Sequence, residues 1–235
     1  MNGFSELSIA GRVAAPSDSD WDAARSAWNL VADQHPAAVA FAESADDVAQ
    51  VVGFAKKHGL KVAGQGTGHR AAALGSLDDM VLLKTERMRA VQVDADSQTA
   101  SIEAGVLVEE LGGAAQAEGM CSMPGSSPNV GVVGYTLGGG LSWLGRRFGF
   151  ACNRVNAIDV VTAADGEARR VDSENDPDLF WALRGGGGGY AIVTALHVHC
   201  FQSRRPMPAR LSCRPSSAPT ACGHTATGPR PCPTT

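Results

Sequence analysis

The stretch Leu60-Lys-Val-Ala63, followed by Gly64-Gln-Gly-Thr-Gly-His69, decides the fold. The first four residues have the apolar character of a buried strand. Three glycines at alternate positions follow, and a histidine comes directly after them. A strand that feeds such a loop presents consecutive backbone N–H groups, which can form a concave site for phosphate oxygens. Glycine permits close approach because it has no side chain. The stretch therefore predicts a ligand-binding loop at the end of a strand.

Other phosphate-binding motifs fit this stretch less well. The dinucleotide fingerprint Gly-x-Gly-x-x-Gly ends in a third glycine and opens a helix, but His69 stands at that position and Arg70–Gly75 is short and alanine-rich. Glu86 is spaced suitably for a ribose contact, yet no βαβ pattern surrounds it. A P-loop is excluded because no Gly-x-x-x-x-Gly-Lys-Ser/Thr occurs. For His69, the alternative to a ligand-binding role is a histidine that fills a turn and forms a hydrogen bond to a carbonyl group.

Periodicity on both sides of the loop predicts a mixture of helices and strands. Ser44 is a helix N-cap with Asp47 three residues later, and apolar residues follow at helical spacing. A helix is also expected over 20–30, with Trp21 and Trp28 on one side. The remaining expected elements are strands over 39–42, 80–83, 90–94, 99–103, 158–163, 168–171 and 190–198, and helices over 108–118 and 177–183.

The overall composition excludes several classes of protein. The formal net charge is -4 without a basic tract, which disfavours nucleic-acid binding through phosphate contacts. No run of 18 apolar residues occurs, so no membrane span is expected. Residues 1–12 lack a basic start followed by an apolar stretch, so no secretory signal is expected. We therefore expect a cytoplasmic location.

The six cysteines do not form a Cys-x-x-Cys pair, and without export they should stay reduced. No metal site is expected. The alternative is a zinc site from Cys213, Cys222 and Cys232 with His224, but this spacing matches no common zinc pattern.

The character of the sequence changes near Gln202. From there to Thr235, Leu211 is the only Leu, Ile, Val or Phe. Such a segment cannot bury enough apolar surface to offset the entropy of ordering. Residues 202–235 are therefore expected to be disordered, and the abrupt change is also what a shifted reading frame would produce.

Several motifs, taken in order, resemble the vanillyl-alcohol-oxidase-like flavoproteins, also called the PCMH-type FAD-binding family. The nearest branch is that of the berberine-bridge-enzyme-like oxidases, which include 6-hydroxynicotine-oxidase-like enzymes. The resemblance covers about residues 10–201, and its ordered series of motifs is specific where one glycine run would not be. The matching stretches are 22–25 with 28–29, 44–48, Val62–His69, 124–134 with 138–140 and 145–149, and 178–187 with 191–194.

The resemblance implies an α+β fold in which FAD lies between two sub-domains. Residues 1–35 would form an N-terminal segment, and 36–201 the FAD-binding domain. Its first part, near 36–105, would carry the pyrophosphate loop, and its second, near 106–201, an antiparallel sheet with flanking helices. In this family a following domain supplies most of the substrate pocket and its general base. Nothing in 202–235 resembles that domain, so no catalytic residue is named.

The resemblance also implies roles for single residues. Backbone N–H groups of the loop would hold the pyrophosphate, and His69 would be bonded covalently to the 8α-methyl group of the flavin. Some relatives carry a second link through a cysteine, but Ser127 stands at the matching position, so at most one link is expected. Gly138 to Gly140 have the alternative of a tight turn that packs on a helix. The cofactor residues expected are Gly64, Gln65, Gly66, Thr67, Gly68, His69, Ser126, Ser127, Val130, Gly131, Gly134, Tyr135, Gly138, and, through backbone groups, Ile192 and Val193.

The reaction implied is hydride transfer from a small organic substrate to the flavin, with dioxygen reoxidising it. Three hypotheses stay open: an oxidoreductase that is active when a substrate domain is supplied, a flavin-binding module without catalysis, and a truncated product that does not fold stably. The sequence leaves open whether the chain alone is an enzyme, which substrate it takes and its oligomeric state.

Overall fold

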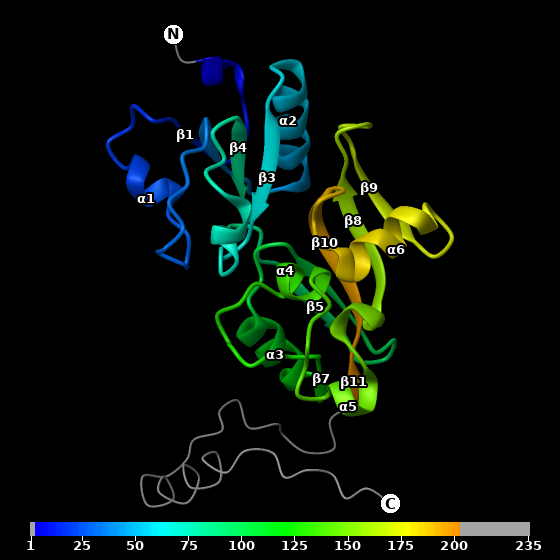
Figure 1. Cartoon of the computed structure of the whole chain (residues 1–235). Helices are drawn as coiled ribbons and strands as arrows, with labels where there is room; N and C mark the ends of the chain where they lie inside the picture. Colours follow the sequence, from blue (N-terminus) through cyan, green and yellow to red (C-terminus); the bar gives the residue numbers. More distant parts are fainter. Residues whose placement is uncertain (1–2, 203–235) are drawn as a thin grey trace, which may run out of the picture. The chain divides into compact units, whose positions relative to one another are not determined.

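The computed structural model of the protein describes residues 3–202 (Figure 1). The expected tail from residue 203 onward and the alternative zinc site lie outside the described residues. The predicted α+β class is confirmed. The strands are β1 (Arg12–Ala14), β2 (Ala38–Phe41), β3 (Lys61–Gln65), β4 (Met80–Lys84), β5 (Val91–Asp94), β6 (Thr99–Glu103), β7 (Met120–Cys121), β8 (Val155–Val161), β9 (Ala168–Asp172), β10 (Ile192–His199) and β11 (Phe201–Gln202). The helices are α1 (Trp21–Arg25), α2 (Ala45–Lys57), α3 (Val108–Ala117), α4 (Val132–Leu137), α5 (Gly145–Phe148) and α6 (Pro177–Gly186), with short 3₁₀ turns at Gly3–Glu6, Ala71–Leu74 and Ala151–Arg154.

The first sheet has four strands in the order β1-β2-β4-β3. Strands β2, β4 and β3 are parallel, and β1 is antiparallel to β2. Helix α2 packs on this sheet through an apolar face that includes Val48 and Val51. Its expected cap is confirmed, because the Ser44 side chain accepts a hydrogen bond of 3.1 Å from the Asp47 N–H. The buried Asp47 carboxylate also accepts from the N–H groups of Ala10 and Gly11, which holds the N-terminal segment against the start of α2.

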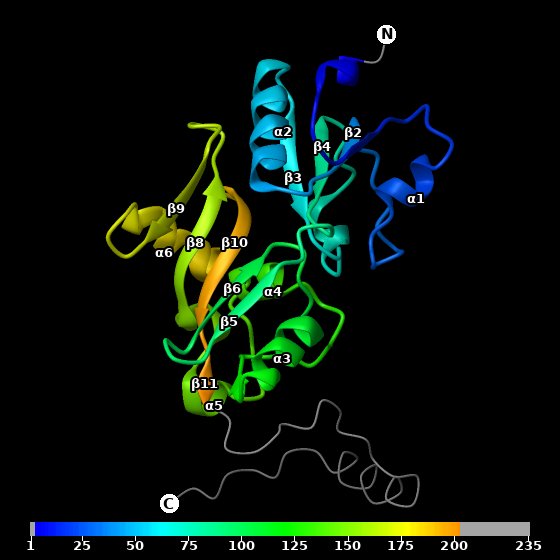
Figure 2. The ribbon, with the colours of Figure 1, turned by 180° about the vertical axis from the view of Figure 1, so that it is seen from behind.

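The second sheet has five antiparallel strands in the order β5-β6-β10-β8-β9. Helix α6 crosses in front of β8 and β10 in Figure 1 and lies behind them in the reverse view of Figure 2. Inward-facing residues of the sheet, including Ile102, Ile158 and Leu196, form one apolar core with residues of α3, α4 and α6. Val161 at the end of β8 packs instead with the core under α2, so the two sheets share an apolar boundary.

Three elements differ from the sequence-based expectation. Strands β5 and β6 precede residue 105, yet β6 pairs with β10 and both lie in the second sheet. The change of sheet therefore falls between β4 and β5. Helix α1 ends at Arg25 rather than extending to residue 30, because Ser26 is extended and the Trp28 N–H donates to the carbonyl of Thr67. Trp21 and Trp28 consequently do not share a helix face.

None of the helices in residues 3–202 is long and apolar enough to cross a membrane.

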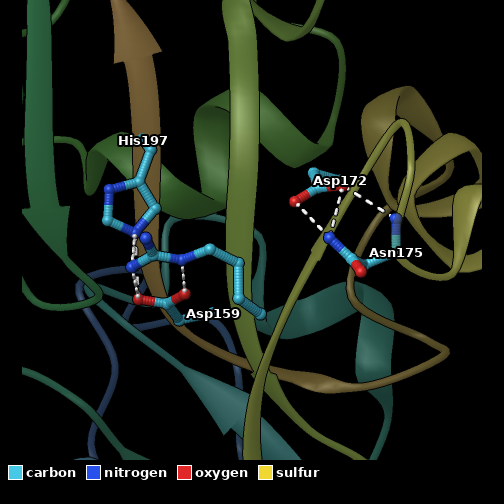
Figure 3. Close-up of polar contacts among 5 residues, drawn as sticks. Asp159, Asp172, Asn175 and His197 are labelled. Carbon is cyan, nitrogen blue, oxygen red and sulfur yellow. Dashed lines mark hydrogen bonds and ion pairs between the residues drawn. The ribbon is translucent and has the colours of Figure 1, made fainter.

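The face of the second sheet opposite α6 carries a charged cluster centred on Asp159 (Figure 3). The Arg170 guanidinium donates to both carboxylate oxygens, at 2.7 and 3.0 Å, and His197 Nε2 lies 2.9 Å from Oδ2. Burial opposes ionisation of Asp159, but the hydrogen bonds from His197 and Arg170 outweigh it, so the pKa of this carboxyl lies well below its usual range. The three side chains come from β8, β9 and β10, and the cluster therefore joins neighbouring strands.

We expect Asp159→Asn to lower the free energy of unfolding by about 1–2 kcal/mol at neutral pH, because charge-assisted hydrogen bonds are lost. A carboxyl whose folded-state pKa is lowered stabilises the protein above its unfolded pKa of about 3.9, and this contribution is lost as the pH falls below that value. Urea unfolding should therefore show a difference between the two proteins that is constant from pH 7 to 5 and shrinks below about pH 4.

Asp96→Asn is the control, because Asp96 is exposed in the turn between β5 and β6. It should leave stability nearly unchanged. A difference between Asp159→Asn and wild type that was as large at pH 3 as at pH 7 would show that the cluster does not act through the ionised carboxylate.

Candidate cofactor site

The predicted ligand-binding loop comes directly after β3, at the carboxyl end of the parallel strands. Gly68 has φ +81°, and a Cβ there would lie 2.7 Å from the Cβ of Ala27, so only glycine fits without strain. Within the described part of the chain, no hydrogen bond engages the backbone N–H groups of Gly66, Thr67, Gly68 or His69. Four successive free N–H groups are the arrangement that binds an anion.

His69 is held on two sides. Its Nδ1 atom lies 2.8 Å from Thr67 Oγ1, and its ring stacks on Trp28 with the centroids 3.9 Å apart and the planes 10° apart. Its Nε2 atom is buried without a hydrogen-bond partner. The sequence did not predict the contact with Trp28, because a helical pattern assigned that residue to a helix face.

A pocket of about 310 Å³ lies beside α4, between the segments that precede and follow this helix. Five of the predicted cofactor residues line it: Ser126, Ser127, Val130, Tyr135 and Gly138. Four further lining residues were not named individually from the sequence: Val108, Gly125, Gly140 and Leu141. Gly125 and Gly140 lie within the glycine-rich motifs that the resemblance already assigned to flavin contact.

The Tyr135 ring lies between two glycines of this pocket. A Cβ at Gly125 or at Gly140 would come within 2.9 or 3.0 Å of the ring, so each glycine makes room for it. The Tyr135 hydroxyl is buried without a hydrogen bond. Burial raises the pKa of the Tyr135 phenol. The side chain of Ser142 lowers this pKa, but its effect is the smaller of the two. The hydroxyl therefore stays protonated near neutral pH and is available as a donor to a ligand.

Gly131 joins the loop to the pocket. A Cβ at Gly131 would lie 3.9 Å from Thr67 N, which places the N-terminal end of α4 beside the loop. Gly134 is exposed on α4 and does not line the pocket.

The two predicted residues on β10 differ in their surroundings. The Ile192 side chain reaches β3, since its Cδ1 would lie 3.2 Å from a Cβ at Gly64. Val193 is buried in the core of the second sheet. Both side chains therefore pack against the apolar cores, as expected.

Unpartnered polar atoms mark this region as a ligand site. Among residues 3–202, the buried side-chain atoms without a hydrogen bond are Gln34 Oε1, Gln65 Oε1, His69 Nε2 and Tyr135 Oη. Gln65, His69 and Tyr135 were all predicted to contact the cofactor. A buried polar group without a partner is costly, and it is rare in a folded protein unless a ligand or water engages it. The donor and acceptor set therefore fits a dinucleotide cofactor with phosphate groups.

Lys84 is a further residue that sequence reasoning missed. It ends β4 beside Gln65 of β3, is 5% exposed, and donates from Nζ to the Ser26 carbonyl at 2.6 Å. Burial lowers the pKa of this amine, although Glu86 opposes the effect. The bond holds the segment after α1 against the carboxyl end of the first sheet, next to Trp28. Among the described residues, no group of three His, Cys, Asp or Glu side chains could hold a metal ion.

Comparison with known proteins agrees with this arrangement. Residues 36–172, more than half of the chain, match the family described as FAD binding domain. The chain is 32% identical over 201 residues to (R)-6-hydroxynicotine oxidase of Paenarthrobacter nicotinovorans, which is 86% of this chain and 44% of that protein. The crystal structure of 6-hydroxy-D-nicotine oxidase from Arthrobacter nicotinovorans matches with a TM-score of 0.78 and 32% identity, over 83% of this chain and 43% of that one.

Two other solved structures are also similar. Glucooligosaccharide oxidase from Acremonium strictum, which has a 6-S-cysteinyl, 8α-N1-histidyl FAD, gives a TM-score of 0.74 and 31% identity over 82% of this chain and 41% of that one. BBE-like 1 of Physcomitrella patens gives a TM-score of 0.76 and 28% identity, over 82% of this chain and 42% of that one. The chain thus spans less than half the length of these relatives. It belongs to the PCMH-type FAD-binding family, in the branch that contains the 6-hydroxynicotine oxidases and the berberine-bridge-enzyme-like proteins.

Proposed function

We propose that this chain is the FAD-binding part of an oxidoreductase that oxidises a small organic substrate by hydride transfer to a flavin bonded to His69, with dioxygen as the electron acceptor. One observation carries the proposal. Three of the residues predicted to contact the cofactor, Gln65, His69 and Tyr135, hold buried polar atoms that the chain itself leaves without partners. The family supplies the identity of the group that would engage them.

The chain's residues would divide the binding between them. The free N–H groups of Gly66 to His69 would bind the pyrophosphate, since consecutive N–H groups attract anions. Ser126, Ser127 and Val130 would line the flavin side of the site, with the Tyr135 hydroxyl as a donor. At the other predicted residues the backbone would approach the cofactor closely. These residues are Gly64, Gly131, Gly134, Gly138, Ile192 and Val193.

A single covalent link is part of the proposal. The similar glucooligosaccharide oxidase carries its FAD on a cysteine and a histidine. This chain has Ser127 where the second link would form, and the Ser127 hydroxyl donates to Asn129 Oδ1 at 2.8 Å. A serine hydroxyl is a far weaker nucleophile than a thiolate at neutral pH. Only His69 is therefore proposed to bond the flavin.

Bound FAD would supply the electron acceptor for the substrate hydride, while the protein positions the ring and limits side reactions. The substrate pocket and its base would come from a further part of the protein or from a partner. Leu141 lines the pocket and is 76% exposed, and Trp143 nearby is 74% exposed. Such exposed apolar side chains are typical of a surface that another part covers. No nucleic-acid or membrane partner is proposed, and the cytoplasmic location stays a prediction.

The alternative is a flavin-binding module without catalysis. The same residues would bind FAD in that case, so the two differ only in turnover once a substrate pocket is supplied.

We expect the purified chain to be yellow, and the colour to stay with the precipitate after acid treatment, because a covalent bond survives unfolding. In His69→Ala the flavin should pass into the supernatant. Absorbance spectra of precipitate and supernatant measure both fractions. Soluble, folded wild-type protein that takes up no flavin from added FAD would exclude the proposal.

We expect Gly134→Ala to weaken non-covalent FAD binding by about tenfold, measured by flavin fluorescence titration in a His69→Ala background. A methyl group would intrude where the backbone is proposed to approach the cofactor. The fold should be unaffected or stabilised by up to about 1 kcal/mol, because alanine favours a helix and a Cβ there meets no atom within 4 Å.

Gly53→Ala is the matched control. Gly53 is exposed in α2, and a Cβ there also meets no atom within 4 Å. This variant should gain the same helical stability and keep wild-type FAD affinity. Equal affinities in the two variants would place the cofactor away from α4.

A further inference from the structure

We propose that Lys84 is the counter-charge for the diphosphate group of FAD bound at the ligand-binding loop. The inference rests on the proposed function and deepens it, because it concerns the same cofactor site. It gives a binding role to a buried residue that lies on the strand beside the loop and is not itself part of the loop.

Lys84 is a buried cation without an ion pair. Its side chain is 5% exposed, and none of the ion pairs between described residues includes its ammonium group. Burial lowers the pKa of the amine, and the exposed Glu86 carboxylate does not offset this effect. A buried charge without a partner is costly in free energy. An anion bound nearby would therefore stabilise the arrangement.

The neighbouring cations leave an excess of positive charge here. The guanidinium groups of Arg12 and Arg87 lie 5.9 and 5.4 Å from the centroid of the Phe41 ring, and the Lys84 ammonium group lies 5.5 Å from it. Each of the two arginines forms an ion pair with a carboxylate. The charge that no carboxylate pairs with is that of Lys84, the most deeply buried of the three.

Two connections place Lys84 beside the loop. On the strand side, Lys84 is paired with Gln65, and adjacent strands lie about 4.8 Å apart. Gln65 directly precedes the first of the four free N–H groups. On the other side, Lys84 donates to the first of residues 26–28, and the Trp28 N–H donates to the Thr67 carbonyl at 3.0 Å. The ammonium group therefore lies close to the loop on both paths.

The free N–H groups and the ammonium group would act together on the same anion. Backbone N–H groups carry only partial charges, whereas the diphosphate of FAD carries two full negative charges. The formal net charge of the chain is -4, so the protein as a whole repels such a ligand. A buried charge is screened less by salt and water than an exposed one. Lys84 therefore supplies the local positive potential that the loop alone lacks.

The test measures the FAD affinity of the full chain by flavin fluorescence titration in a His69→Ala background, the parent, where binding is reversible. We expect Lys84→Met, which keeps the length of the side chain and removes its charge, to weaken FAD binding by about tenfold, because one attraction between charges inside a protein is worth at least that factor. Lys84→Gln keeps an N–H donor for the Ser26 carbonyl but also lacks the charge. It should weaken binding equally.

The dependence on pH separates charge from shape. The difference between the parent and the two Lys84 variants should shrink as the pH rises toward about 10, because the Lys84 amine loses its proton below its usual pKa of about 10.4. Carboxylate and guanidinium groups do not titrate between about pH 7 and 10. The groups of these two kinds around Lys84 are those of Arg12, Asp20, Glu43, Glu86 and Arg87.

Lys61→Met is the matched control. It also removes one positive charge, but from the exposed beginning of β3, at the opposite end of the strand that leads into the loop. This variant should keep the affinity of the parent at every pH. A loss as large as that of Lys84→Met would show a general effect of net charge and overturn the inference.

Two further results would also overturn the inference and leave the proposed function intact. One is parent affinity in Lys84→Gln, which would show that Lys84 acts only through its hydrogen bond to Ser26. The other is a difference between the parent and the Lys84 variants that stays constant up to pH 10. A folded parent that binds no FAD at all would overturn the proposed function as well.

Discussion

The arrangement depends on one close approach between backbones at Gly105. A Cβ at this residue would lie 2.1 Å from the Thr85 carbonyl oxygen and 2.8 Å from that of Met88, so no other residue fits there without displacement of the chain. The Gly105 N–H donates to the Met88 carbonyl at 2.8 Å. Met88 belongs to the core under α2, whereas Gly105 lies two residues after the end of β6. The two sheets are therefore joined through main-chain contacts and not only through side-chain packing.

The cofactor site is built outward from this junction. The Thr85 N–H donates to the Gln65 carbonyl at 3.0 Å, where the ligand-binding loop begins. The Thr85 hydroxyl donates to the Ala104 carbonyl, and the Ala104 N–H donates to the Thr194 carbonyl at the start of β10. The neighbouring Val106 carbonyl accepts from the Val132 N–H at the start of α4. The ligand-binding loop, β10 and α4 therefore converge on residues 104–106. Hydrogen bonds connect β10 and α4 to these residues directly and connect the loop to them through Thr85.

The parts of this arrangement that sequence reasoning predicted are those decided by local residues. The Ser44 cap, the strand before Gly64 and the α+β class follow from capping, hydrophobicity and turn chemistry within a few residues. Contacts between distant segments could not be predicted in that way. Trp28 carries a helical pattern, but its N–H is satisfied by Thr67, and the helix ends earlier. Likewise, β6 looks continuous with the preceding strands, although its partner β10 follows about ninety residues later.

The unit that builds the site is larger than residues 36–172, which match the FAD binding domain family. Strand β10 lies outside that range, yet it pairs with both β6 and β8 and is the centre of the second sheet. Without it, β6 and β8 would each present an unpaired edge and Ile102 and Ile158 would lose their shared core. Residues 26–28 also lie outside the range, yet they cover His69 and pack on Gly68. A shorter piece limited to residues 36–172 would keep the glycine loop but lose both strand β10 and the indole that stacks on the loop histidine.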